Sequence, residues 1–103
     1  MFDLFFGRSI PGGGTVSADD WDRFLDDTVT PNLPAGYTVL DGTGAWRNPM
    51  TGQTGREPSI VILGVLPDTP DSLAAVNRVR AAYQRRFHQQ LVGMASVPVC
   101  GAF

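Results

Sequence analysis

The sequence predicts an α+β fold with the element order β-α-β-β-α-β. One observation is the run Ile60–Leu66, in which every residue is apolar or glycine, because such a run indicates a strand covered on both faces. The other is that two capped, amphipathic segments each lie between strand-like segments. Right-handed crossovers with a hairpin between the middle strands then give a four-stranded antiparallel sheet in the order 4-1-3-2. Both helices lie on one face, which is the ferredoxin-like arrangement.

The first strand and first helix follow from local patterns. Phe2–Gly7 is rich in aromatic and branched residues and is typical of a strand, whereas Gly12–Gly14 predicts a loop. Ser17 is an N-cap with an acid three residues later, so the helix is expected to begin there. Thr30–Pro31 is expected to end it, because the residue before proline is pushed out of the helical region. The buried stripe of this helix is predicted to consist of Trp21, Phe24, Leu25 and Val29.

The middle of the chain predicts a hairpin. Tyr37–Leu40 is the second strand, and Asp41–Gly44 is expected to twist or bulge it before Ala45–Arg47. Asn48–Gly55 describes a flexible connection. The chain then enters the central strand through Arg56–Ser59.

The second helix and last strand complete the order. Thr69 is the predicted cap, with Pro70 at the first helical position, where a missing N–H costs nothing. Leu91–Phe103 supplies the last strand, and Pro98 places it at an edge of the sheet. The buried stripe of this helix is predicted to consist of Leu73, Val76, Val79 or Ala82, Tyr83 and Phe87.

Composition limits the classes of function. A chain of 103 residues is expected to be a single domain, residues 1–103, and a net charge of -2 gives no electrostatic case for nucleic acid or anionic lipid. No stretch approaches membrane-spanning length, and the short apolar start lacks the basic leader of a signal peptide, so we expect a cytoplasmic protein. One cysteine and one histidine, without metal-ligand spacing, predict no metal and no cofactor.

The predicted topology gathers polar residues at one rim of the sheet, where the first strand ends. Arg8, beside the glycine loop and the start of the first helix, is a candidate anion clamp. Glu57 is the candidate general acid or base, because burial at a strand end can raise its pKa. The alternative is that Arg8 and Glu57 form a structural ion pair. The candidate substrate-binding residues at this rim are Ser9, Trp46, Arg56, Ser59 and His88. His88 has a competing interpretation as a helix-terminal cation.

The sheet face away from the helices is predicted to be too apolar for water. The central strand is apolar on both faces, and Phe5 adds to the same surface. Face-to-face homodimerisation would cover it, and a bound apolar ligand is the alternative.

Several motifs together resemble a bacterial family of small domains of unknown function. The motifs are Phe6-Gly7-Arg8-Ser9, Trp21-x-x-Phe24, Thr30-Pro31, Pro34-x-Gly36-x-Thr38-Val39-Leu40-Asp41, Gly44-x-Trp46-Arg47, Arg56-Glu57-Pro58-Ser59 and Tyr83-x-x-x-Phe87. The resemblance covers nearly the whole chain and implies the same fold, but it implies no particular activity.

Two functions therefore stay open. The first is a small-molecule binding protein or cofactor-independent enzyme, acting on a small aromatic or anionic compound at the rim. The second is a non-catalytic dimerising or interaction module. An enclosed cavity at the rim in which Glu57 is reachable by solvent would favour the first, and a filled rim the second.

Overall fold

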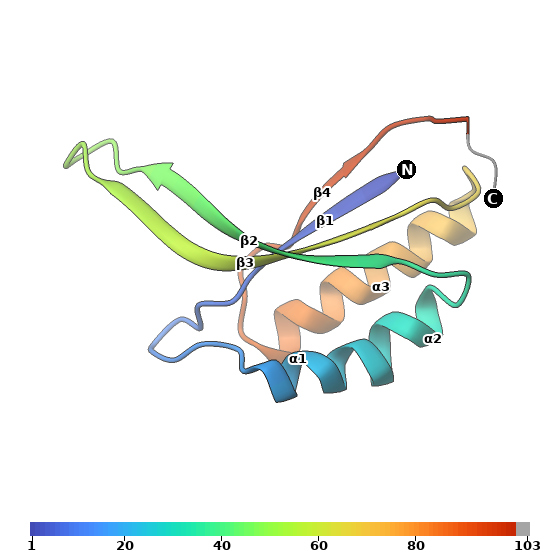
Figure 1. Ribbon diagram of the computed structural model, residues 1–103, viewed down its shortest axis with the longest axis horizontal. Helices are drawn as coiled ribbons and strands as arrows, with labels where there is room; N and C mark the ends of the chain where they lie inside the picture. The colour runs from blue at the N-terminus through green and yellow to red at the C-terminus, as the bar shows by residue number, and fades with distance from the viewer. Residues whose placement is uncertain (101–103) are drawn as a thin grey trace.

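The computed structural model describes residues 1–100 and consists of one antiparallel sheet with helices on one face (Figure 1). The strand order is β2-β3-β1-β4, so the predicted order 4-1-3-2 is confirmed. No helix in this range is long and apolar enough to cross a membrane. The elements are β1 (Phe2–Gly7), α1 (Ala18–Phe24), η1 (Leu25–Val29), α2 (Thr30–Asn32), β2 (Thr38–Arg47), β3 (Thr54–Gly64), α3 (Pro70–Arg86) and β4 (Gly93–Ser96).

The hairpin of β2 and β3 is longer and more regular than predicted. Its register runs without interruption from Thr38 opposite Leu63 to Arg47 opposite Thr54, so the predicted bulge at Asp41–Gly44 is wrong. The glycines there leave space above the partner strand instead of breaking the pairing. Residues 56–59 lie inside β3 and do not merely precede it.

Pro58 fits inside β3 because of where its backbone nitrogen points. The Pro58 carbonyl accepts a 3.0 Å hydrogen bond from the Arg8 amide, on the side of β3 that faces β1. The nitrogen of the same residue points to that side too, just beyond the last pair of β1 and β3, Gly7 with Ser59. The missing N–H therefore costs no ladder hydrogen bond.

The first helical segment begins as predicted and ends later. The Ser17 side chain accepts a 3.0 Å hydrogen bond from the Asp20 amide. The prediction that the helix ends at Thr30–Pro31 is wrong, because the chain stays helical to Asn32. The Thr30 amide bonds to the Leu25 carbonyl in a π-helical turn. This turn changes the hydrogen-bonding register just before Pro31, so the helix passes through the proline.

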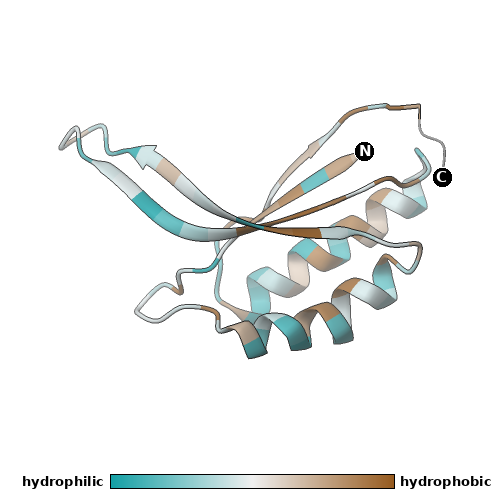
Figure 2. Ribbon diagram, viewed as in Figure 1, coloured by the Kyte–Doolittle hydropathy of each residue, from teal (hydrophilic) through white to brown (hydrophobic). Residues whose placement is uncertain are grey.

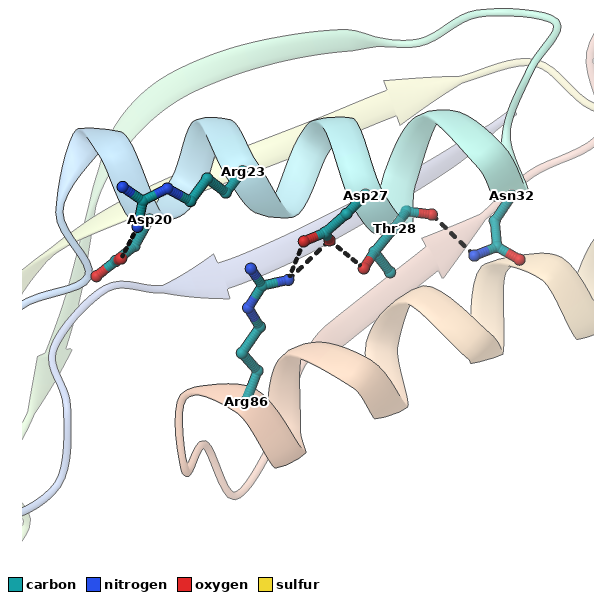
Figure 3. Close-up of polar contacts among 6 residues, drawn as sticks. All are labelled: Asp20, Arg23, Asp27, Thr28, Asn32 and Arg86. Atoms are coloured by element: carbon teal, nitrogen blue, oxygen red, sulfur yellow. Dashed lines mark hydrogen bonds and ion pairs between the residues drawn. The ribbon is translucent and has the colours of Figure 1, made fainter.

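Figure 3 shows how this segment is tied to α3. Arg86 donates to both carboxylate oxygens of Asp27, at 2.7 and 2.9 Å, and Thr28 donates to Asp27 at 2.7 Å. The hydrogen bonds from Arg86 and Thr28 lower the pKa of Asp27. The pair lies at the surface, so we expect it to fix the helix orientation more than to stabilise the fold.

The core lies between the sheet and the helices. Phe6 packs edge-to-face with Trp21, Phe24 and Tyr83, with ring centroids 5.2, 6.3 and 4.8 Å apart. The Tyr83 hydroxyl donates a 2.7 Å hydrogen bond to the Gly7 carbonyl, which ties α3 to the end of β1.

The two predicted stripes are largely confirmed. Trp21, Phe24, Val29, Val76, Val79, Tyr83 and Phe87 are buried, and Leu25 and Ala82 pack against them. Leu73 is 50% exposed, so its assignment to the core is wrong. It faces a cavity beside the last strand, because β4 ends at Ser96 and leaves the first turn of α3 uncovered.

The last strand is shorter than predicted. Gly93–Ser96 pairs with β1 at the sheet edge, and Pro98 follows the strand and does not interrupt it. The predicted part of this strand in residues 101–103 lies outside the described residues.

Candidate functional site

The candidate residues that were expected together lie on opposite faces of the sheet. Side chains alternate along a strand, so Arg8 follows Phe6 toward the helices. Glu57 and Ser59 alternate with the buried Ile60 and therefore point to the helix-free side. The expected single rim site is thus divided into two separate surfaces.

On the helix side, Arg8 lines a cavity between α1 and the strands β2 and β3. The volume of this cavity is about 380 Å³, within the range of small-molecule sites. We call it the α1 cavity. Its lining residues are Arg8, Ala18, Trp21, Asp22, Leu25, Val39, Asp41 and Ile60.

The Arg8 guanidinium is held in place, but one of its nitrogen atoms has no hydrogen-bond partner in the described chain. Its Nε and Nη2 atoms donate to the Val16 carbonyl at 3.1 and 2.7 Å. The Nη1 atom has no hydrogen-bond partner within residues 1–100, and no ion pair joins Arg8 to Glu57 there. The alternative interpretation of Arg8 and Glu57 as a structural ion pair is therefore wrong, because the sheet separates the two side chains.

Trp21 also lines this wall, but its indole nitrogen does not open to the cavity. The residue is 5% exposed and packs in the core, as predicted. Its Nε1 atom is the only fully buried side-chain nitrogen or oxygen in the described chain without a hydrogen-bond partner. Trp21 therefore offers a ligand contact with its ring and not a hydrogen-bond donor.

Two carboxylates line the α1 cavity from different elements. Asp22 comes from α1, and Asp41 comes from β2, two residues after Val39 and on the same face of that strand. Neither was predicted as a site residue, and Asp41 was expected only to belong to a twisted or bulged part of the second strand. The alternation of Val39 and Asp41 was the available signal for Asp41.

On the helix-free face, Glu57 occupies a notch made by glycine. A Cβ atom added at Gly7 would lie 3.0 Å from Glu57 Oε1, and one at Gly44 would lie 3.8 Å from Glu57 Cγ. Within residues 1–100 the carboxylate receives no hydrogen bond from a side chain and forms no ion pair. Glu57 is thus half-buried in an apolar surface without a partner.

Charged residues on both surfaces shift the pKa of Tyr83, whose hydroxyl is hydrogen-bonded to the Gly7 carbonyl. Burial raises the pKa of Tyr83 to about 12, the positive charge of Arg8 lowers it, and the negative charge of Glu57 raises it. The phenol therefore stays neutral over the physiological range and serves as a hydrogen-bond donor.

Trp46 lies further along the helix-free face. It is 53% exposed, and its ring lies over Gly55, where an added Cβ would be 2.5 Å from the ring. It is not part of the α1 cavity. A wall formed jointly by Trp46 and Arg8 is therefore not present.

Three further predicted residues join neither surface. Arg56 is exposed on the projecting hairpin, and Ser9 is exposed in the loop after β1, where its carbonyl accepts a 2.8 Å hydrogen bond from Gln89. His88 is exposed after α3, with a φ of 56°. Residues 1–100 contain no group of three or more His, Cys, Asp or Glu residues that could hold a metal ion.

The opposite rim holds a larger cavity that the sequence analysis missed. It has a volume of about 740 Å³ and lies between the start of α3 and the outer ends of β1 and β4. Its wall is largely apolar, with Phe2, Leu66, Leu73 and Val76 among its residues. It offers no charged side chain apart from Asp68, so it suggests no specific chemistry.

Comparison with known proteins gives a family and a fold. A family model described as "Protein of unknown function (DUF3574)" matches residues 2–103. No curated protein matches significantly.

Two solved structures are similar to the chain. One is a phage SAM lyase in complex with S-methyl-5'-thioadenosine, with a TM-score of 0.60 and 17% identity, covering 90% of this chain and 75% of that one. The other is a phage SAM lyase in the apo state, with a TM-score of 0.56 and 16% identity, covering 97% and 90%. At this identity the likeness shows a shared fold.

Proposed function

Because the chain belongs to the DUF3574 family of proteins of unknown function, we propose its function from geometry: it binds a small molecule in the α1 cavity. The observation that carries the proposal is the free Nη1 atom of Arg8 on the cavity wall. The Val16 carbonyl holds the guanidinium in place, and Nη1 has no hydrogen-bond partner within residues 1–100. An acceptor on a ligand would pair with it.

The Arg8 side chain is preorganised for binding. The two hydrogen bonds to the Val16 carbonyl fix the orientation of Arg8 before any ligand arrives, which lowers the entropy lost on binding. The α1 cavity is therefore suited to an anionic or polar group in a defined orientation.

The structural neighbours support this proposal at the level of the fold. The phage SAM lyases are similar over most of this chain, and one of them holds S-methyl-5'-thioadenosine. We infer that the same fold in this chain serves small-molecule binding, and that any reaction catalysed there would need no cofactor. Glu57 would act in such chemistry only from the helix-free side, away from Arg8.

The two tryptophans give a test with an internal control. We expect S-adenosylmethionine or S-methyl-5'-thioadenosine to shift the indole N–H resonance of Trp21 in ¹⁵N-labelled protein, because Trp21 lines the α1 cavity. The resonance of Trp46 should stay in place, because Trp46 lies on the helix-free face. The variant Trp46→Phe assigns the two signals.

Each other outcome of this titration contradicts the proposal. A shift of Trp46 alone would place the ligand on the helix-free face. If neither resonance moves at millimolar concentrations of either compound or of the probes named below, the α1 cavity is not a small-molecule site.

A second candidate function is homodimerisation through the helix-free face. Phe5, Leu40 and Trp46 point to this face and are 46%, 49% and 53% exposed. Figure 2 shows apolar residues concentrated in the central part of the strands, whereas the outer hairpin is hydrophilic. A second copy of the chain would cover this apolar centre, and its side chains would enter the glycine notches beside Glu57.

We expect Leu40→Arg to convert a dimer to a monomer, because the substitution places a charge at the centre of the proposed interface. Sedimentation velocity over a range of concentrations measures this. The matched control is Leu73→Arg, because Leu73 is equally exposed but lies on α3. A wild-type chain that stays monomeric at high concentration, or a dimer that Leu40→Arg leaves intact, would contradict this role of the face.

A further inference from the structure

Within residues 1–100, the α1 cavity is lined by side chains of both charges that form no ion pair with one another. Arg8 lines it from the end of β1, Asp22 from α1 and Asp41 from β2. In the described part of the chain, the ion pairs are Arg23 with Asp20 and Arg86 with Asp27, so neither cavity carboxylate lies within 4.0 Å of the Arg8 guanidinium.

The separation of these charges is a consequence of the fold. Arg8 is oriented by the Val16 carbonyl, and Asp41 is fixed in β2 by its pairing with Ile60 of β3. Opposite charges on one cavity wall normally approach each other when their side chains are free to do so. Here the Arg8, Asp22 and Asp41 side chains come from different elements, and the cavity lies between them.

We propose that the ligand of the α1 cavity is a zwitterion, which carries a carboxylate and a cationic ammonium or onium group. The inference rests on the proposed function of this cavity. The carboxylate accepts hydrogen bonds from the Arg8 guanidinium beside the ring of Trp21, and the cationic group faces Asp41 and Asp22. α-Amino acids and their onium derivatives belong to this class.

Ligands with one charge fit the wall less well. A simple anion would pair with Arg8 but face two carboxylates, and a simple cation would pair with the carboxylates but face the positive charge of Arg8. A zwitterion alone uses both sets of groups. The excess of acidic residues favours a ligand with an additional cationic centre over one with an additional anionic centre.

Four related probes separate the charge requirements. L-Methionine and S-methyl-L-methionine carry both charges, 4-(methylthio)butanoate lacks the amine, and 3-(methylthio)propylamine lacks the carboxylate. Calorimetry gives the affinities, and the Trp21 resonance reports the site. We expect the better zwitterion to bind at least about tenfold more tightly than either singly charged probe.

Variants assign the charges to residues. Asp41→Asn should weaken zwitterion binding about tenfold and leave binding of 4-(methylthio)butanoate unchanged or stronger, whereas Arg8→Gln should weaken both. Asp19→Asn is the matched control, because it removes the same charge from the exposed side of α1 and does not line the cavity. Circular dichroism checks that Arg8→Gln stays folded, and Asp41→Asn tests the inference independently of that variant.

The outcomes distinguish this inference from the function on which it rests. If S-methyl-5'-thioadenosine or a singly charged probe shifts Trp21 and binds as tightly as the zwitterions, the cavity is a site but the ligand class is wrong. Equal effects of Asp41→Asn and Asp19→Asn would also overturn the zwitterion assignment. If no compound shifts Trp21, the proposed function fails as well.

Discussion

Replacing Phe6 with alanine is expected to lower the free energy of unfolding by about 3–5 kcal/mol. Phe6 is fully buried, and its ring contacts Trp21, Phe24 and Tyr83, so its removal leaves a cavity where β1 meets α1 and α3. Small domains have a total stability of about 5–15 kcal/mol, so this loss brings the chain near unfolding. Urea denaturation followed by circular dichroism measures the change.

Phe5→Ala is the matched control, because it removes the same side chain from the adjacent position of β1. Phe5 is 46% exposed on the helix-free face. At a concentration where the chain is monomeric, we expect this variant to lose less than about 1.5 kcal/mol. Equal losses for the two variants would contradict the assignment of the core to the helix side of the sheet.

Raising the pH from 10 to 12 is expected to remove about 2 kcal/mol of stability through Tyr83 alone. Burial raises the pKa of Tyr83 to about 12, from the ordinary value of 10.0 that we assign to the unfolded chain. Well below pH 10 the phenol is protonated in both states, and its contribution to stability is complete. As the pH rises through 12, the unfolded state loses its proton first, so unfolding becomes more favourable. Urea denaturation at intervals across this range measures the slope.

Tyr83→Phe separates this titration from other alkaline effects. The variant should lose about 1–2 kcal/mol at neutral pH, because the Gly7 carbonyl loses the 2.7 Å hydrogen bond from the Tyr83 hydroxyl. Its stability should then fall less steeply than that of the wild type above pH 10. Tyr37 is present in both proteins, so it does not contribute to the difference. Parallel curves would show that Tyr83 is not the titrating group.

The fold was predictable from the sequence where short-range signals determine it. The caps at Ser17 and Thr69 depend on residues three positions apart, and the structure contains both hydrogen bonds. The extent of the hairpin was not predictable in this way, because pairing across β2 and β3 overrides the turn preference of the glycines near Asp41. The passage of the helix through Pro31 likewise depends on a π-helical turn that has no sequence signature.

The candidate site was predictable only in part. Arg8 was predicted to be an anion clamp and keeps a free Nη1 atom, but its expected proximity to Glu57 rested on their location at one rim of the sheet. The alternation of side chains along β3 would have separated them, since Glu57 and the buried Ile60 are three residues apart and point to opposite faces of the sheet. The unpaired Trp21 nitrogen and the position of Asp41 depend on three-dimensional packing, so a single sequence does not reveal them.

The projecting part of the β2–β3 hairpin has a consequence for aggregation. Beyond Gly7 and Ser59, β3 has no neighbour on the side where β1 ends, so this edge is open to a strand from another molecule (Figure 1). Pro58 lies at the start of that open edge and offers no N–H to an incoming strand. Arg56 adds a charge two residues further along the same edge. The proline that β3 tolerates without loss therefore also protects the chain against uncontrolled strand addition and fibre formation.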